Sequence, residues 1–406
     1  MLNAHNGRSL RSALPHGAVS PGLEGLMRIL HVITALDTGG AERMLLKLLS
    51  ASQGEHCQAV VSLKDDGTIG AQIRKLGIAV YGLGLRRNFP NPLSALSILP
   101  ALRHFRPDLV QGWMYHGNIA ASLAGKLARS LAPVVWNIRQ SLSDLADQRR
   151  LTRAVIRLGA TMSRFPAAVI YNSDSGARQH ATYGYRPVRH EIIPNGFDCS
   201  EFCPNDDAYR QFREELGVQD DAILIGLVAR YHPVKDHAGF LRAARLVARE
   251  HPQTRFVLVG PGVNQEQPVL SRTIAEYELQ DRIFMLGERF DMPRLTAALD
   301  IACSASWAEG FSNTIGEAMC CGVPCVVTDV GDSAHIVGDT GLCVPPRNPQ
   351  AFANAIGQLI GSGATQRRDL GVAARRRIVK EFSLSAIWHR YETLYHELST
   401  CEKACR

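Results

Sequence analysis

The chain has 406 residues, 46% of them hydrophobic and 20% charged, which suits two or three packed domains and argues against a disordered chain. Residues 1–200 carry 23 Lys and Arg against 12 Asp and Glu, a net charge of +11, whereas residues 201–406 carry 22 against 26, a net of −4. The basic half suggests an anionic partner, such as nucleic acid, a membrane surface or a phospholipid-linked substrate, and no apolar run is long enough to cross a bilayer.

Strand and helix patterns alternate through the first half. An apolar, β-rich run at Arg28–Thr34 is followed by a glycine turn and by a helical pattern over Ala41–Leu49. The further strands predicted in this half are Ala59–Ser62, Ala79–Gly82, Leu109–Gly112, Val134–Asn137 and Ala168–Tyr171. Strands that alternate with helices predict a parallel sheet covered on both faces.

The alternation stops after Asn195 and Gly196 and restarts with a strand over Ala222–Ala229. We therefore place a linker at residues 197–205. A helix is predicted over His237–Arg249 and a terminal helix from about Ser383 to Leu398. The other strands predicted in this half are Arg255–Val259, Arg282–Leu286, Ile301–Ser304 and Cys325–Thr328. Two doubly wound α/β halves are expected, with ligands bound beyond the carboxyl ends of the strands.

The N-terminus and the cysteines bear on the location of the protein. Residues 1–26 lack the apolar core of a signal peptide, so we expect a disordered extension, with Met27 as an alternative start. None of the ten cysteines forms a C-x-x-C pair, which favours buried reduced thiols over a zinc site. Reduced thiols without an export signal predict a cytoplasmic protein.

Two glutamates eight positions apart, Glu309 and Glu317, flank a predicted strand–loop–helix junction. We expect Glu309 to point into the mouth of a cleft and Glu317 to lie near the first turn of a helix whose free N–H groups face a phosphate. A carboxylate accepts hydrogen bonds from two vicinal hydroxyls, as in ribose or a hexose. The alternative is a purely structural capping box made by Thr314 and Glu317.

Two cations follow the strand predicted over Ala222–Ala229. Arg230 ends this strand, and Lys235 comes just before the next helix. Both are expected at the carboxyl edge of the second sheet, where they would stabilise the charge that develops on a diphosphate leaving group. Two solvated surface cations are the alternative.

Two features of the first half are expected at the same cleft. Gly39 and Gly40 follow the first strand, and glycine there lets backbone N–H groups approach an anion, although the segment is neither a dinucleotide fingerprint nor a P-loop. His116 follows the strand Leu109–Gly112, so we expect it to project toward the cleft, where it hydrogen-bonds a sugar hydroxyl or supports positive charge at the reacting carbon. An ordinary loop histidine is the alternative.

Taken together, five segments resemble the retaining glycosyltransferases of family four, which have the GT-B fold. The segments are GGAE at Gly39–Glu42, NSDS at Asn172–Ser175, PNG at Pro194–Gly196, the R-x4-K pair and the E-x7-E pair. The resemblance implies two Rossmann-like domains that face each other across a cleft. An acceptor-side domain would span residues 27–196, a nucleotide-sugar donor domain 197–382, and a terminal helix at 383–406 would pack back on the first domain.

The same resemblance assigns roles to residues. Arg230 and Lys235 would bind the donor diphosphate, Glu317 the ribose and Glu309 the transferred sugar, and His116 matches the histidine of the first domain. The remaining candidates would line the donor and acceptor sites, and they are Gly39, Gly40, Asn195, Gly196, Phe311, Ser312, Asn313 and Thr314.

The implied reaction moves a hexose from a nucleotide-diphosphate sugar to a hydroxyl of a lipid-linked or polysaccharide acceptor. A UDP-sugar is favoured and a GDP-sugar is the alternative. The anomeric configuration would be retained by front-face attack, in which the departing phosphate takes the acceptor proton. No metal or other cofactor is expected, and the sequence has no D-x-D motif.

The GGAE variety resembles bacterial enzymes that build lipid-linked polysaccharide, capsule or lipopolysaccharide. Arg149, Arg153 and Arg157 lie at i, i+4 and i+8 of a predicted helix, with apolar residues nearby. We expect this helix to rest on an anionic membrane, at the inner face of the plasma membrane. A solvated arginine face on an ordinary packed helix is the alternative.

Other functions stay open at this point. A nucleotide-sugar epimerase on the same architecture would isomerise its substrate without an acceptor. A non-catalytic partner subunit is a second alternative, against which the intact Arg230, Lys235, Glu309 and Glu317 argue. A dehydrogenase would need the dinucleotide glycine pattern, and a nucleic-acid-binding protein would need aromatic residues among the basic ones.

Overall fold

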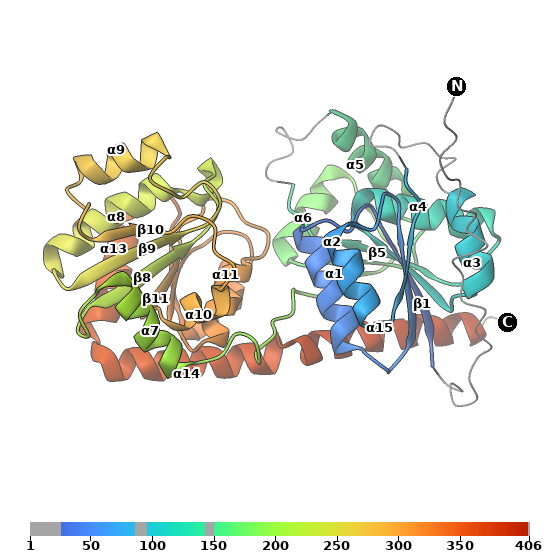
Figure 1. Cartoon of the computed structure of the whole chain (residues 1–406). Coiled ribbons are helices and arrows are strands. Elements are labelled where there is room, and N and C mark those ends of the chain that lie inside the picture. Colours follow the sequence, from blue (N-terminus) through green and yellow to red (C-terminus); the bar gives the residue numbers. More distant parts are fainter. Residues whose placement is uncertain (1–25, 86–95, 143–149, 405–406) are drawn as a thin grey trace, which may run out of the picture.

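The computed structural model describes residues 26–85, 96–142 and 150–404 (Figure 1). The expected disordered extension and Arg149 lie outside the described residues, apart from Leu26. The described chain forms two α/β lobes, each built on one parallel sheet (Figure 1). Among the described residues, no helix is both long and apolar enough to cross a bilayer.

The first lobe holds a seven-stranded sheet in the order β3-β2-β1-β4-β5-β6-β7. The six predicted strands of this half are all present, within two residues at each end. The sequence does not predict β7, because its three residues, at the sheet edge, include only one apolar side chain. The strands are β1 (Arg28–Ile33), β2 (Cys57–Ser62), β3 (Ala79–Gly82), β4 (Leu109–Trp113), β5 (Val134–Ile138), β6 (Ala168–Tyr171) and β7 (His190–Ile192).

Helices connect the strands of the first lobe. The first of them, α1, buries Met44, Leu45, Leu48 and Leu49 on one face, which is the spacing of a helix that packs on a sheet. The helices are α1 (Gly40–Ala51), α2 (Gly67–Lys75), α3 (Leu99–Phe105), α4 (Met114–Leu127), α5 (Arg150–Met162) and α6 (Asp174–Tyr183).

The second lobe holds a six-stranded sheet in the order β10-β9-β8-β11-β12-β13. Its strands are β8 (Ile223–Val228), β9 (Thr254–Val259), β10 (Ile283–Met285), β11 (Ile301–Ser304), β12 (Cys325–Thr328) and β13 (Leu342–Val344). The five predicted strands are present, and the three-residue edge strand β13 is the one the sequence does not predict. In both sheets the strand order reverses beside the first strand, which places a ligand crevice at the carboxyl ends of β1 and β4 and of β8 and β11.

The helices of the second lobe lie on both faces of its sheet (Figure 1). They are α7 (Asp206–Leu216), the 3-10 helix η4 (Pro233–Lys235), α8 (His237–Glu250), α9 (Pro268–Glu276), α10 (Met292–Ala297), α11 (Asn313–Cys320), α12 (Ser333–Val337), the 3-10 helix η5 (Gly338–Thr340), α13 (Pro349–Gly361) and α14 (Gly363–Glu381).

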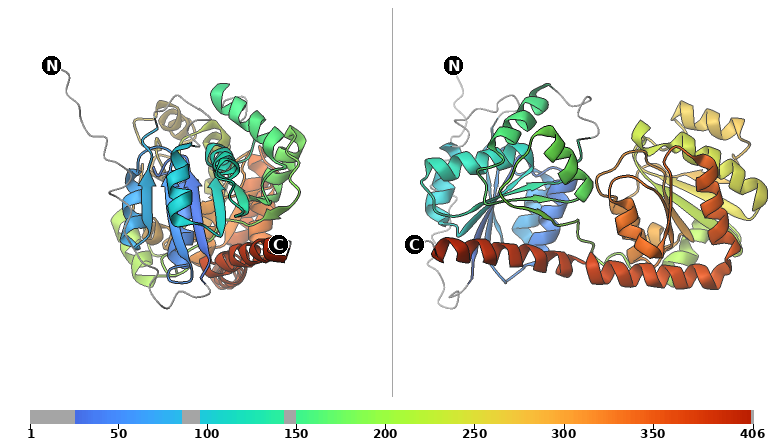
Figure 2. Two further views of the ribbon diagram at one scale, coloured as in Figure 1. Left: turned by 90° about the vertical axis from the view of Figure 1, so that its right-hand side faces the viewer. Right: turned by 180° about the vertical axis from the view of Figure 1, so that it is seen from behind.

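The chain passes between the lobes twice, and the two crossings pair with each other. The Phe197 N–H donates to the Phe382 carbonyl (2.9 Å), and the Leu384 N–H donates to the Phe197 carbonyl (3.0 Å). Beyond this point α15 (Leu384–Ala404) continues along the same side of the molecule as α14 (Figures 1 and 2). Its Tyr391 and Tyr395 are buried in the core of the first lobe, so the far end of the chain completes that core.

Candidate active site

A cavity of about 740 Å³ lies between the lobes, at the carboxyl ends of the strands. The first lobe contributes the start of α1, and the second contributes the segments that follow β8 and β9 and the start of α11. This is the place where doubly wound sheets bind ligands. Seven of the predicted site residues line it: Gly40, Asn195, Gly196, Arg230, Asn313, Thr314 and Glu317.

Arg230 is exposed in this cavity, two residues beyond the end of β8. Its guanidinium makes no ion pair with any residue that the structure describes. The loop after β9 lies directly against the segment that carries it. Gly260 there has a φ of +147°, and a Cβ at that position would collide with the Ala229 carbonyl. Glycine at position 260 therefore permits the loop after β9 to pack closely against the segment that carries Arg230.

Glu317 lies in the second turn of α11, not in the first. The helix begins at Asn313 with Ser312 as its N-cap, and in the described chain no side chain makes the cap hydrogen bond. The capping box that would join Thr314 to Glu317 is therefore wrong, since Glu317 lies two residues too far along the helix. Burial raises the pKa of Glu317 to about 7, against the opposing charges of Lys47 and Arg43.

Lys235 and Glu309 form an ion pair with each other just outside the lining of this cavity. The Glu309 carboxylate also accepts a hydrogen bond from the Ser306 hydroxyl (2.8 Å). Trp307 fixes the loop after β11 against η4, because its backbone N–H donates to the Val234 carbonyl and its indole N–H to the Pro233 carbonyl (2.9 Å each). The four charged groups thus follow adjacent strands, β8 and β11, as two sets: Arg230 and Glu317 in the cavity, and a neutralised pair beside it.

His116 lies in the first turn of α4, so the alternative of an ordinary loop histidine is wrong. Met114 adopts a left-handed φ of +59° directly after β4, and the helix starts there without an intervening loop. Burial lowers the pKa of His116, and the charge of Lys64 adds to this effect. The imidazole is therefore neutral at neutral pH, and it lies outside the lining of the cavity.

The predicted residues near the start of α1 and α11 differ in exposure. Gly39 is the exposed N-cap of α1, and a Cβ there would collide with the Glu42 carboxylate, which folds over the helix start. An anion bound at this helix start would therefore displace Glu42.

Phe311 and Ser312 are buried, and the Phe311 ring stacks on Phe197 at a centroid distance of 6.0 Å, so that ring belongs to the core.

A hydrogen-bonded network that sequence reasoning missed joins the two lobes at the cavity. Arg139 donates to the Tyr391 hydroxyl of α15 (2.8 Å) and to the Asn195 side-chain carbonyl. Asn195 in turn donates to the side-chain oxygen of Asn313 on α11 (2.6 Å). Arg139 follows β5 directly, so the signal that identified Arg230, a cation at the end of a buried strand, would also have found it.

Two cations of α1 were also missed. Arg43 and Lys47 are four residues apart, hence on one face of the helix, and both line the cavity opposite Glu317. A basic i, i+4 pair directly after a glycine turn was the available signal. The first lobe thus adds positive charge to a cavity whose second-lobe wall carries Arg230.

The NSDS segment forms a cap between the lobes. Ser173 is the N-cap of α6 and its hydroxyl accepts from the Gly176 N–H (3.0 Å). Asp332 of the second lobe accepts from the N–H groups of Asp174 (3.0 Å) and Ser175 (3.2 Å). A carboxylate at a helix N-terminus is stabilised both by these hydrogen bonds and by the helix dipole. The segment therefore holds the two lobes together across the cleft.

Replacing Asp332 by Ala should favour a more open arrangement of the lobes. The change removes two charge-assisted hydrogen bonds that cross the cleft, each worth about 1.5–3 kcal/mol. Small-angle scattering should show a larger radius of gyration for D332A. The exposed neighbour Asp329 supplies a matched control, D329A, which should leave the radius unchanged. Equal radii for D332A and the unaltered protein would show that this cap does not hold the cleft closed.

Comparison with known proteins identifies both lobes. Residues 38–201 match the family model described as Glycosyltransferase Family 4, and residues 222–362 match that described as Glycosyl transferases group 1. The D-inositol 3-phosphate glycosyltransferase of Kribbella flavida is 31% identical over 218 residues, 51% of each chain, so the match spans about half its length. The UDP-Gal:alpha-D-GlcNAc-diphosphoundecaprenol alpha-1,3-galactosyltransferase of Escherichia coli is 22% identical over 92% of this chain and 97% of its own.

Solved structures match over nearly the whole chain. HepE of Anabaena, in complex with UDP-glucose, superposes with a TM-score of 0.74 and 25% identity, covering 91% of this chain and 99% of its own. Sucrose-phosphate synthase of Thermosynechococcus elongatus has the same fold, with a TM-score of 0.70 and 18% identity over 92% of this chain and 100% of its own. The predicted GT-B fold is confirmed, and the chain belongs to the GT-B glycosyltransferases of family four, whose two Rossmann-like lobes meet at the cavity described above.

Proposed function

We propose that this glycosyltransferase moves a hexose from a UDP-sugar to a hydroxyl of a lipid-linked or polysaccharide acceptor, with retention of configuration. The observation that carries the proposal is the cavity between the lobes, where Arg230, Glu317 and the start of α1 face one another. Two relatives support the choice of substrates. HepE is described in complex with UDP-glucose, and the Escherichia coli relative is named for UDP-galactose and a diphosphoundecaprenol acceptor.

Within the proposed donor site, different residues contact different parts of the nucleotide sugar. The unpaired Arg230 guanidinium contacts the diphosphate, and the Glu317 carboxylate accepts hydrogen bonds from the two ribose hydroxyls. The approaching diphosphate then draws Lys235 away from Glu309, which frees that carboxylate for a hydroxyl of the hexose. The ion pair between Lys235 and Glu309 is thus broken only when a diphosphate is bound.

The transfer step relies on charges that are already in place. As the bond between the sugar and the diphosphate breaks, Arg230 and Lys235 stabilise the charge on the leaving phosphate without reorganisation. A phosphate oxygen takes the proton of the acceptor hydroxyl, which attacks from the same face of the sugar. No carboxylate base and no metal ion are required by this route.

A nucleotide screen tests the donor assignment. A ligand at a hundred times its dissociation constant adds about 2.7 kcal/mol of stability, which corresponds to a rise in Tm of roughly 3 °C for a chain of this size. We expect this rise with UDP, a smaller one with GDP, and none for UDP with the R230A variant. The exposed aromatic ring of Phe290 at the cavity rim, 90% exposed, offers a face for the base. A larger rise with GDP would reverse the choice of base.

Product analysis tests the reaction and its stereochemistry. With a UDP-α-hexose and a lipid-linked acceptor, NMR should show an α-linked product, and a β-linked product would overturn retention. The donor incubated without acceptor should keep its sugar unchanged. An isomerised sugar in that incubation would instead support a nucleotide-sugar epimerase.

We further propose that α5 rests on the anionic inner face of the plasma membrane, which would place the enzyme at the cytoplasmic surface. Arg153 and Arg157 are exposed on this helix, and so are Leu151 and Leu158, which are 44% and 46% exposed. Basic and apolar side chains exposed together on one helix suit a charged interface better than bulk water. The opposite face of α5 buries Val155 and Ile156 in the lobe.

Vesicle co-sedimentation tests this placement. The protein should bind vesicles that contain phosphatidylglycerol, and R153E/R157E should reduce binding at least tenfold, because two contacts worth about 1 kcal/mol each become repulsive. The matched control is R242E/R249E, which makes the same charge change at two exposed arginines of α8 in the other lobe. Undiminished binding by R153E/R157E would refute a role for α5.

A further inference from the structure

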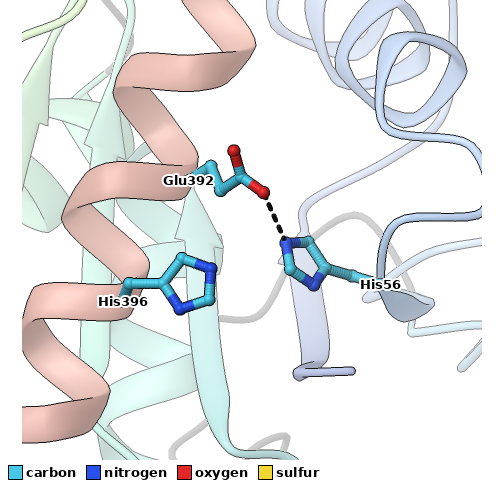
Figure 3. Close-up of side chains that lie close together, drawn as sticks. All are labelled: His56, Glu392 and His396. Atoms are coloured by element: carbon cyan, nitrogen blue, oxygen red, sulfur yellow. Dashed lines mark ion pairs between the residues drawn. The ribbon is translucent and has the colours of Figure 1, made fainter. Parts of the chain in front are cut away.

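A group of potential metal ligands lies far from the cavity, where the turn before β2 meets α15. His56 comes from that turn, and Glu392 and His396 lie four residues apart on one face of α15 (Figure 3). One donor atom from each side chain lies within 4.8 Å of the other two. We propose that these three side chains bind a zinc-class divalent metal ion that fastens the C-terminal helix to the first lobe.

His56 provides the independent observation that points to a ligand. Its side chain is only 4% exposed, yet neither ring nitrogen has a hydrogen-bond partner among the residues that the structure describes. The nearest carboxylate oxygen, on Glu392, is 3.6 Å from Nε2, which is an ion-pair distance and too long for a hydrogen bond. A buried imidazole with both nitrogens unsatisfied is costly, and metal coordination would satisfy the one that faces the cluster.

The separations suit tetrahedral coordination. Zinc binds imidazole nitrogen and carboxylate oxygen at about 2.0–2.2 Å, so two ligand atoms on one tetrahedral ion are about 3.3 Å apart. The 3.6 Å between His56 Nε2 and Glu392 Oε1 is close to this value, and a small rotamer change brings in His396, which is exposed. Two imidazoles and one carboxylate favour zinc over magnesium or calcium, which take oxygen ligands.

Neighbouring residues hold the proposed metal ligands in place. His389, one turn before Glu392, places its Nδ1 3.6 Å from the second carboxylate oxygen and so orients that group from outside the cluster. Trp388 anchors the same junction, since its indole N–H donates to the Glu55 carboxylate.

The bound metal ion would have a structural role and would take no part in the transfer reaction. Tyr391, next to Glu392 on α15, accepts a hydrogen bond from Arg139, which in turn bonds to Asn195 at the cavity. A metal ion that fixes α15 on the first lobe would therefore also fix the support of this network. Its binding free energy would add to the stability of the folded chain.

Calorimetric titration of the tag-free protein with Zn²⁺ tests the site. We expect one equivalent to bind, and Zn²⁺ at a hundred times its dissociation constant to raise Tm by roughly 3 °C. The H396Q variant alters an exposed helical residue, so it should fold normally and lose both effects, and H56N should do the same if it folds. H104Q is the matched control, since it makes the same substitution at an exposed histidine of α3 in the same lobe, and it should keep both effects.

One further control separates the cluster from the thiols. Cys199 and Cys320 are close to each other, with their sulfur atoms 3.2 Å apart, and thiols also bind zinc. The C199S variant should therefore bind Zn²⁺ as the unaltered protein does. No binding by the unaltered protein, undiminished binding by H396Q, or loss of binding in C199S would overturn the inference. The stabilisation by UDP should persist in H396Q, so failure here would leave the donor site unaffected.

Discussion

The K235A variant should lower turnover by roughly a hundredfold or more while the protein stays folded. Lys235 ends η4 at the carboxyl edge of the second sheet, and its ammonium carries the positive charge nearest to Glu309. In the proposed reaction it contacts the bound diphosphate and stabilises the charge that develops there as the bond to the sugar breaks, so the interaction is stronger in the transition state than in the ground state. Its loss should therefore appear in kcat more than in KM.

The ion pair requires a control for stability. Lys235 partly neutralises the Glu309 carboxylate, whose side chain is 13% exposed, so K235A alone also leaves a half-buried charge unpaired. In K235A/E309Q that charge is gone, and the double variant should regain Tm without regaining turnover. K75A alters an exposed lysine at the end of α2 and should change neither quantity. Near-normal turnover of K235A would show that the donor site is wrongly assigned.

The E317Q variant should lose activity and gain stability at alkaline pH. The neutral amide cannot accept two ribose hydroxyls as a carboxylate does, and a hydrogen bond to a charged group is worth about 1.5–3 kcal/mol, so kcat/KM at pH 8 should fall roughly 10- to 100-fold. Glutamine keeps the shape of the side chain, so this loss reports the charge.

The stability effect follows from the raised pKa. Burial raises the pKa of Glu317 from 4.5 to about 7, so between these values the folded chain holds a proton that the unfolded chain has released. The unaltered protein therefore loses stability as the pH rises from about 4.5 through 7, and E317Q does not. The Tm of E317Q should equal that of the unaltered protein near pH 4.5 and exceed it at pH 8. Parallel Tm curves for the two proteins across this range would contradict the claim that burial raises the pKa of Glu317.

The same ionisation predicts a pH dependence of donor binding. The affinity of the unaltered protein for UDP should increase as the pH rises from 6 to 8, because the carboxylate form accepts both ribose hydroxyls. E317Q should show a flat profile over this range. Isothermal titration at three pH values measures both, and equal slopes for the two proteins would place the ribose away from Glu317.

The fold follows from the sequence where burial on both faces leaves a clear pattern. Strands such as β8, with the sequence Ile223–Val228, are continuous apolar runs because helices cover the sheet on both sides. The edge strands β7 and β13 have three residues each, too few to show a period. The helix α14 was also not predicted, and it buries only Gly371, Ala374 and Ile378 along its length. An element with so narrow a buried face has little apolar period to detect.

The charged residues of the candidate site were predictable where each one directly follows a predicted strand or its loop. Arg230 and Glu317 were found because each sits directly beyond an apolar strand or its loop. The pairing of Lys235 with Glu309 depends on how two loops close on each other, and a linear sequence holds no sign of it. The loop alternative for His116 is wrong for a local reason, since the left-handed backbone at Met114 starts α4 without a loop. The cap made by Asp332 depends on the arrangement of the lobes, which only the folded structure supplies.

The most direct test of the whole account is a crystal structure of the complex with UDP-glucose. The diphosphate should lie within hydrogen-bonding distance of Arg230 and Lys235, with the ribose hydroxyls on Glu317 and the glucose on Glu309. The ion pair between Lys235 and Glu309 should be broken in that complex. A nucleotide bound away from this cavity, or an intact pair beside a bound diphosphate, would contradict the proposed donor site.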